Sequence, residues 1–222
     1  MKARFISRRE IGPGIWEFFL TPESQLDYQA GQYVEVQLPD VVDPRGPART
    51  LSLTSLPTDN EVSFAVKFPT PHSAYKARLL ELAEGDEVTL SQAMGDLVLP
   101  RDKARPLVFV AGGLGIASFV SMMKQDAAEA SSRHITLLYA HKPGEKLFEE
   151  AIEACPGLKL TEFVSPKRLM FDDIIQDDAN MLYYISGSEP FTMQFRDQLL
   201  DTSVPATNIV YDYFDGYHVR DF

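Results

Sequence analysis

Hydrophobic and polar residues alternate with a period of two over most of the chain up to about residue 100. This period is typical of β-strands that bury one face. Six segments show it, with turn-forming residues between them: residues 2–9, 15–20, 32–38, 49–54, 62–68 and 87–90. Six short strands at such close spacing predict a small antiparallel β-barrel.

One segment within this region has helical spacing instead. Residues 72–82 follow two prolines, and their leucines fall near one side of a helix. Ser73 or His72 stands where a helix N-cap is expected. We therefore predict a short helix that caps one end of the barrel.

The pattern changes after the charged, proline-ended segment 101–106. Apolar runs then alternate with helical segments. The predicted strands are residues 107–110, 135–140, 158–164, 181–186 and 208–211, and two of the predicted helices are residues 146–154 and 189–200. This alternation predicts an α/β domain with a parallel sheet and helices on both faces. We expect residues 1–101 to form the barrel domain and residues 102–222 the α/β domain.

The first strand of the second domain leads into a cluster of glycines. Residues 107–110 are apolar without alternation, which suits a strand buried on both faces. Gly112, Gly113 and Gly115 follow and precede a helical segment, whose free backbone N–H groups favour a phosphate. Ser118 stands where the usual dinucleotide motif has a third glycine. We interpret the turn as nucleotide-binding, and the alternative is a tight turn without a ligand.

Composition limits the classes of function. A net charge of -11 over 222 residues argues against nucleic-acid binding as the main activity. No segment approaches the roughly 20 apolar residues of a membrane span, and the start lacks a signal-peptide core, so we expect a cytoplasmic protein. The single Cys155 excludes an internal disulfide and a Cys-ligated iron–sulfur cluster within the chain. The four histidines lack metal-ligand spacing, so no metal site is expected.

Four stretches together resemble the ferredoxin–NADP⁺ reductase superfamily, flavin-dependent reductases in which a barrel precedes a nucleotide-binding domain. The first, Arg49-Thr50-Leu51-Ser52, is similar to the flavin motif Arg-x-Tyr-Ser/Thr. The others are Pro71-His72-Ser73 at the cap helix, the glycine-rich turn at 111–116, and Ser186-Gly187-Ser188-Glu189-Pro190, which is similar to a Cys-Gly-x-x segment. The resemblance covers nearly the whole chain.

This resemblance implies bound FAD, with FMN left open, and NADPH or NADH as the hydride donor. Arg49 would bind the flavin pyrophosphate, for which a planar guanidinium is well suited. Ser52 would lie beside the flavin N5 as a catalytic residue. The flavin-binding residues implied are Arg49, Thr50, Leu51, Ser52, His72 and Ser73. The alternatives are a surface arginine, an ordinary strand serine and a plain N-cap at Ser73.

In the second domain the resemblance implies that Ser186 lies near the nicotinamide as a second catalytic residue. The implied coenzyme-binding residues are Gly112, Gly113, Gly115, Gly187 and Glu189. The alternative for this segment is a strand-to-helix turn with Ser188 as its cap.

Three positions depart from the family pattern. Leu51 replaces a common Tyr, Ser118 a frequent Pro, and Ser186 a frequent Cys. None of these changes removes an obligatory acid, base or metal ligand. They bear on efficiency and on the class of partner more than on the type of reaction.

Basic residues suggest which coenzyme is used. The second predicted strand ends at His141 and Lys142 and offers no acid for a ribose 2′-OH. This pair, with Arg168 after the third strand, favours a 2′-phosphate and therefore NADPH. The alternative is that all three are exposed loop cations.

The C-terminal tail contains more aromatic residues than a polar terminus needs. In the family a C-terminal aromatic often covers the flavin, so the resemblance suggests Tyr213, Phe214 or Tyr217 for that position. Their rings would add area and offset stacking. The alternative is that they close the sheet edge or form a dimer contact, and the sequence leaves the oligomeric state open.

We therefore expect a flavoprotein that takes a hydride from NAD(P)H and passes electrons to an external acceptor. A ferredoxin, a flavodoxin, an oxygenase component or a small quinone-like molecule all fit. One alternative is a regulatory or electron-transfer subunit that keeps the flavin without turning over NAD(P)H, and another is a nicotinamide dehydrogenase without flavin.

Overall fold

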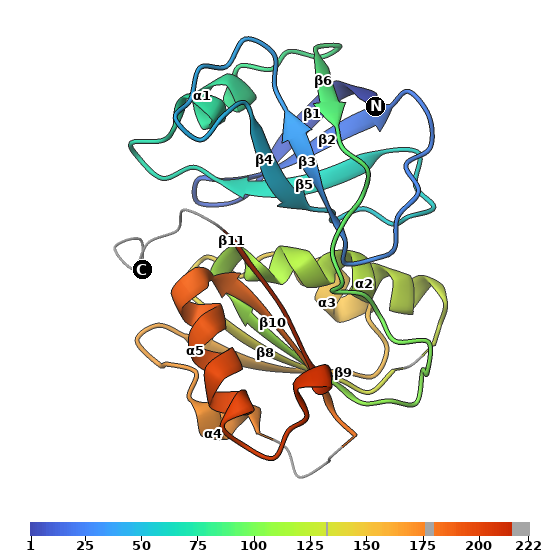
Figure 1. The fold of residues 1–222 in the computed structure, drawn as a ribbon, viewed down its shortest axis with the longest axis vertical. Coiled ribbons are helices and arrows are strands. Elements are labelled where there is room, and N and C mark those ends of the chain that lie inside the picture. The colour runs from blue at the N-terminus through green and yellow to red at the C-terminus, as the bar shows by residue number, and fades with distance from the viewer. Residues whose placement is uncertain (132, 176–179, 215–222) are drawn as a thin grey trace.

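The computed structural model describes residues 1–131, 133–175 and 180–214, and its chain folds into a strand-rich part and an α/β part (Figure 1). The strands of the first part are β1 (Lys2–Gly12), β2 (Ile15–Pro22), β3 (Tyr33–Gln37), β4 (Ala48–Ser52), β5 (Val62–Lys67) and β6 (Glu87–Leu90). All six predicted strands are present, with ends that differ by a few residues.

The six strands pair antiparallel in the order β4-β3-β6-β1-β2-β5. The two ends of this order meet just beyond β4, where Leu53 bridges to Phe64. The Thr54 N–H also donates to the Ser63 carbonyl at 2.8 Å. The sheet therefore closes on itself, which confirms the predicted barrel.

The helix α1 (Ala74–Leu80) covers the barrel as predicted, although it is shorter than expected. Ser73 is its N-cap and accepts a hydrogen bond from the Lys76 N–H at 3.4 Å. Tyr75 and Leu79 are buried, and the Tyr75 hydroxyl donates to the Val36 carbonyl at 2.9 Å. This bond fixes the helix to β3.

The second part contains β7 (Leu107–Gly112), β8 (Ile135–His141), β9 (Leu158–Val164), β10 (Leu182–Ser188) and β11 (Ile209–Phe214). Its helices are η1 (Gly113–Ile116), α2 (Ala117–Ala128), α3 (Glu149–Ala154), α4 (Phe171–Ile174), α5 (Glu189–Leu200) and η2 (Ala206–Asn208). The predicted parallel α/β domain is confirmed. The sequence analysis missed α4 and η2, which are too short to produce a helical pattern. None of the described helices is long and apolar enough to cross a membrane.

The parallel strands follow the order β11-β10-β7-β8-β9. The chain runs outward from β7 through β8 to β9, then crosses back to β10 on the other side of β7. Open α/β sheets bind ligands at such a reversal, outside the carboxyl ends of the strands. Every residue of β7 and β10 is buried, which explains why their sequences lack alternation.

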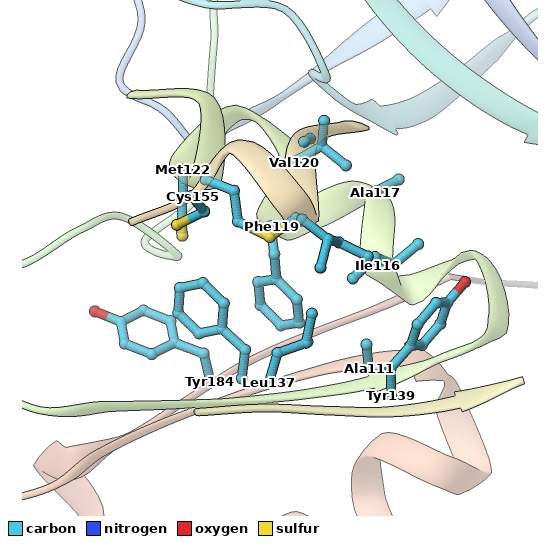
Figure 2. Close-up of a cluster of buried hydrophobic side chains, with 14 of the residues drawn as sticks. Ala111, Ile116, Ala117, Phe119, Val120, Met122, Leu137, Tyr139, Cys155 and Tyr184 are labelled. Atoms are coloured by element: carbon cyan, nitrogen blue, oxygen red, sulfur yellow. The ribbon is translucent and has the colours of Figure 1, made fainter. Parts of the chain in front are cut away.

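The helix α2 lies between the sheet and the barrel, while α4 and α5 cover the opposite face of the sheet (Figure 1). On the sheet side, Phe119 packs among the apolar side chains of the strands (Figure 2). The Phe119 ring stacks on Phe109 with centroids 4.5 Å apart. On the barrel side α2 presents Ser118 and Ser121, and both are fully buried.

A charged cluster at the C-terminal end of α2 holds the connection between the two parts. Asp126 is fully buried, and its Oδ1 lies 3.5 Å from Nε of Arg133. The Arg133 guanidinium also donates to the carbonyls of Pro100 at 2.9 Å and Asp102 at 3.2 Å. These bonds fasten residues 100–102, which precede β7, to the second part.

Replacing Arg133 by Ala leaves the buried carboxylate of Asp126 without its cationic partner. We expect the free energy of unfolding to fall by about 3–5 kcal/mol, as measured by urea unfolding. Lys103→Ala is the control, because it removes an exposed ion pair to Glu129 that is worth about 0–1 kcal/mol. Equal losses in the two variants would contradict the structural role of the buried pair.

Candidate cofactor-binding site

A cavity of about 400 Å³ opens at the carboxyl ends of the parallel strands. Of the residues predicted to bind the coenzyme, those in its wall are Gly112, Gly113, Gly115 and Gly187. The three predicted cations are also in the wall, His141, Lys142 and Arg168, together with Lys167. Glu189 is outside the wall, because as the first residue of α5 it is exposed to solvent.

Glycine is favoured at each of these positions in the cavity for a different physical reason. A Cβ on Gly115 would lie 2.2 Å from the Ser186 carbonyl oxygen, so only glycine lets η1 contact β10. Gly113 has φ of 54°, in the left-handed region that favours glycine. A Cβ on Gly112 or Gly187 would meet the ring of Phe191 at 3.0 or 2.7 Å. Phe191 therefore lies over two glycines in the cavity, and sequence analysis missed it.

A second cavity, of about 220 Å³, lies on the barrel. It contains the sequence-predicted flavin residues from β4 and from the start of α1: Arg49, Thr50, Leu51, His72 and Ser73. Ser52 is buried and outside its wall. Pro69 and Leu114 line both cavities, so the two spaces adjoin where the barrel meets η1.

Arg49 is not the surface arginine of the alternative interpretation, because only 12% of its side chain is exposed. Its Nη2 donates to Oδ1 of Asp43 at 2.7 Å, and Nη1 donates to the carbonyls of Gly46 and Ala48 at 2.9 and 2.7 Å. The guanidinium also lies 4.7 Å from the centre of the Tyr75 ring. These contacts with other residues of the protein fix the orientation of the Arg49 guanidinium.

Asp43 is the partner that the sequence analysis missed. Its carboxylate accepts the N–H groups of Tyr75 at 3.1 Å and Arg45 at 2.9 Å, in addition to Arg49. Burial alone would raise the pKa of Asp43, but these hydrogen bonds and the guanidinium outweigh it and hold the pKa well below its usual range. An ionised Asp43 therefore joins α1, the loop before β4 and Arg49.

Three serines form a hydrogen-bonded chain across the boundary between barrel and sheet. The Ser118 hydroxyl is 3.2 Å from that of Ser52 and 3.0 Å from that of Ser186. Ser52 is 5% exposed, and the other two are fully buried. The structure thus brings the two predicted catalytic serines together through Ser118, which the sequence had shown only as a departure from the family pattern.

The same face of α2 makes two further bonds to the barrel. The Ser121 hydroxyl donates to the Ser55 carbonyl at 2.6 Å, and Nζ of Lys124 donates to the Thr54 carbonyl at 2.7 Å. Burial lowers the pKa of Lys124, and the nearby Glu17 carboxylate opposes that shift. Ser118, Ser121 and Lys124 thus fix the position of the barrel cavity relative to the cavity of the parallel sheet.

Behind His141 of the first cavity lies an acid that the sequence analysis did not find. Glu162 of β9 lies 3.1 Å from Nε2 of His141 and 3.2 Å from Nζ of Lys146. Burial alone would raise the pKa of Glu162, but the bonds from His141 and Lys146 outweigh it and lower the pKa. The sequence analysis considered the end of β8 alone, whereas Glu162 lies on the neighbouring strand β9, in register with Tyr139.

No family model matches the chain. The electron transfer component of toluate 1,2-dioxygenase from Pseudomonas putida is 26% identical over 214 residues, which cover 86% of this chain. The aligned part is 60% of that relative, so the chain spans less than two thirds of its length.

Solved structures match more completely. The flavohem-like FAD/NAD-binding domain of nitric oxide dioxygenase from Vibrio cholerae has a TM-score of 0.81 at 21% identity, covering 96% of this chain and 98% of that one. The chain has the ferredoxin–NADP⁺ reductase fold. A ferredoxin–NADP⁺ reductase from Neisseria gonorrhoeae, solved with bound FAD and NADP, gives 0.78 at 16% identity with the same coverage of both chains. The resemblance inferred from the sequence is thereby confirmed at the level of the fold.

The end of this reductase fold is described only in part. In β11, Tyr213 pairs in register with Gly187 and is 36% exposed, and it lines neither cavity. Phe214 ends that strand, but its side chain and the whole of Tyr217 lie outside what the structure describes. The expectation that an aromatic residue of the tail covers a flavin therefore stays a prediction.

Two glycine substitutions, one at the end of β7 and one in η1, test the packing of the first cavity. We expect Gly115→Ala to lower the free energy of unfolding by about 1–3 kcal/mol, because the new methyl meets main-chain atoms of β10. Gly112→Ala is the matched control, since its methyl meets a Phe191 ring that can shift. Urea unfolding of both variants measures the difference, and a smaller loss for Gly115→Ala than for Gly112→Ala would contradict this account.

Proposed function

We propose that this chain is an FAD-dependent oxidoreductase that accepts a hydride from NAD(P)H and passes electrons to an acceptor outside this sequence. The observation that carries the proposal is the meeting of two cavities at Pro69 and Leu114. One cavity is built on the barrel and the other at the strand reversal of the parallel sheet. With both cavities occupied, this arrangement would let one ligand contact the other where the cavities adjoin.

The residues of the barrel cavity fit a flavin with a pyrophosphate. Arg49 supplies a cation already held in position by Asp43, and His72 and Ser73 lie in the same wall. Leu51 offers an aliphatic surface to the ring system. Ser52, one residue further along β4, is buried behind this wall, and its hydroxyl is bonded to that of Ser118.

The residues of the larger cavity fit a nicotinamide coenzyme. Gly113 and Gly187 let it approach the backbone closely, and Phe191 offers an aromatic surface beside them. When bound, the flavin supplies the atom that accepts the hydride. The chain itself binds and orients the two partners and excludes water between them.

The electron acceptor is proposed as an oxygenase component or another external carrier. The single Cys155 of the sequence cannot ligate an iron–sulfur cluster, and its buried thiol has a pKa raised to about 12, chiefly by burial and then by Asp126. The likeness to an electron transfer component of a dioxygenase supports the oxygenase class. A ferredoxin, a flavodoxin or a small molecule fits the same chemistry.

The absorbance spectrum of the purified protein tests the proposal. We expect a yellow protein whose flavin absorbance is bleached by NADPH or NADH without oxygen. A yellow protein that neither coenzyme bleaches would support the alternative of a flavin-holding subunit. A colourless protein that does not take up added FAD would overturn the flavin assignment.

We further propose NADPH as the preferred donor. Four side chains that are cationic or can become so line the outer part of the larger cavity: His141, Lys142, Lys167 and Arg168. Lys142, Lys167 and Arg168 would offer charge-assisted hydrogen bonds to a 2′-phosphate. Both ring nitrogens of His141 are already bonded, to the Lys142 carbonyl and to Glu162. An acid that binds a ribose 2′-OH would favour NADH. Glu162 is not placed for this role, because it is bonded to His141 and Lys146 and lies outside the cavity wall.

We expect Arg168→Ala to lower kcat/KM for NADPH by about tenfold, the value of one charge-assisted hydrogen bond, and to leave that for NADH nearly unchanged. Lys159→Ala on the exposed side of β9 is the matched control and should alter neither value. Steady-state rates with both coenzymes measure the effect. A strong preference of the parent protein for NADH would reverse the assignment.

A further inference from the structure

The aromatic ring of Phe191 lies against the backbone in the wall of the larger cavity. Gly112 ends β7 and Gly187 lies near the end of β10, the neighbouring strands at which the order of the parallel sheet reverses. A Cβ on Gly112 would lie 3.0 to 3.1 Å from three atoms of the ring, and a Cβ on Gly187 would lie 2.7 Å from it. The ring therefore covers the glycines at both strand ends.

The ring has one packed side and one open side. It meets the ring of Phe195 edge to face, with centroids 4.9 Å apart, and Phe195 is itself buried. A contact of this kind changes an equilibrium constant by about threefold to tenfold beyond the area it buries. Phe191 is only partly buried, so solvent adjoins its other side. The ring is thus held in place by a modest free energy and has space into which it can turn.

The helix α5, which carries Phe191, is itself fixed to the sheet. Pro190 restricts the backbone immediately before Phe191. Thr192 follows and is fully buried, and its hydroxyl donates to the Asp212 carbonyl of β11 at 3.4 Å. Leu199, two turns further along α5, is also fully buried. The ring can therefore leave the two glycines by rotation of its side chain, while the helix stays in place.

We propose that Phe191 sets the affinity for the nicotinamide half of the coenzyme, because its ring occupies the space over Gly112 and Gly187 and must turn aside before the coenzyme reaches them. This rests on the proposed function, which places a nicotinamide coenzyme in the larger cavity. Glycine at the two strand ends then has two uses. It makes room for the ring in the empty protein and for the coenzyme in the complex.

Only those molecules in which the ring has turned aside can bind the whole coenzyme. The apparent dissociation constant is the intrinsic constant divided by their fraction, and the contact with Phe195 keeps that fraction at about a tenth to a third. The cations Lys142, Lys167 and Arg168 follow β8 and β9, on the other side of β7 from β10. A ligand that binds only to these cations does not require Phe191 to move.

The test compares NADP⁺ with 2′-phospho-AMP, which carries the adenosine and the 2′-phosphate but has no nicotinamide. Calorimetric titration of the oxidised, flavin-loaded protein gives both dissociation constants, and NADP⁺ cannot transfer a hydride under these conditions. If the parent protein prefers NADH, NAD⁺ and AMP form the corresponding pair. The variants are Phe191→Ala, Phe191→Trp and, as the control, Phe171→Ala. Phe171 packs against the same hydrophobic cluster and is partly buried, but it lies outside the cavity wall.

The measured quantity is the dissociation constant of NADP⁺ divided by that of 2′-phospho-AMP. We expect Phe191→Ala to lower this ratio by about threefold to tenfold, because no ring then covers the glycines. Phe191→Trp should raise the ratio, since a larger ring covers the same glycines, and Phe171→Ala should keep the parent value.

An unchanged or higher ratio in Phe191→Ala would overturn the proposal, because a ring that stacks on the bound coenzyme weakens binding when it is removed. A lower ratio in Phe191→Trp would overturn it as well, and this variant decides the question if Phe191→Ala does not fold. Flavin absorbance and thermal unfolding show whether each variant keeps its flavin and its fold. A parent protein that holds flavin but binds neither coenzyme would instead contradict the proposed function.

Discussion

The burial of α2 on two opposite sides is the constraint on which the rest of this structure depends. Its apolar side chains, among them Phe119, form the core against the parallel sheet. Its opposite face bonds to the barrel through Ser118, Ser121 and Lys124. A helix in this position cannot move relative to one part without breaking its contact with the other. The junction of the two cavities, immediately before α2 at Leu114, therefore has a fixed geometry.

The hydrogen bonds of this interface also fix the position of α2 on the barrel. An apolar helix face could slide along the barrel, whereas each buried hydroxyl or ammonium group must find its partner or lose the free energy of a hydrogen bond. Asp43 does the same within the barrel, where one carboxylate holds Arg49, α1 and the loop before β4. Buried polar groups thus position the site, and apolar packing supports it.

The sequence predicted the fold well, because each pattern reflects local burial. A period of two indicates a strand buried on one face, and an unbroken apolar run indicates a strand buried on both faces. It predicted both segments of the barrel cavity and the glycine turn for the same reason, since each is a contiguous stretch. Asp43, Glu162 and Phe191 were missed because their roles depend on neighbours in space. Glu189 was placed in the coenzyme site by motif alone, and the start of α5 turns it to solvent.

The departures from the family pattern are best understood together. Taken one at a time, Ser118 in place of Pro and Ser186 in place of Cys look like losses of typical features. Proline at the first of these positions could accept no side-chain hydrogen bond, and a thiol at the second would be a weaker donor than a hydroxyl. With serine at both, and with Ser52 within reach, three hydroxyls are hydrogen-bonded to one another in a buried interface. Ser186 depends on this pairing more than Ser118 does, because the hydroxyl of Ser118 is its described side-chain partner, whereas Ser118 also bonds to Ser52.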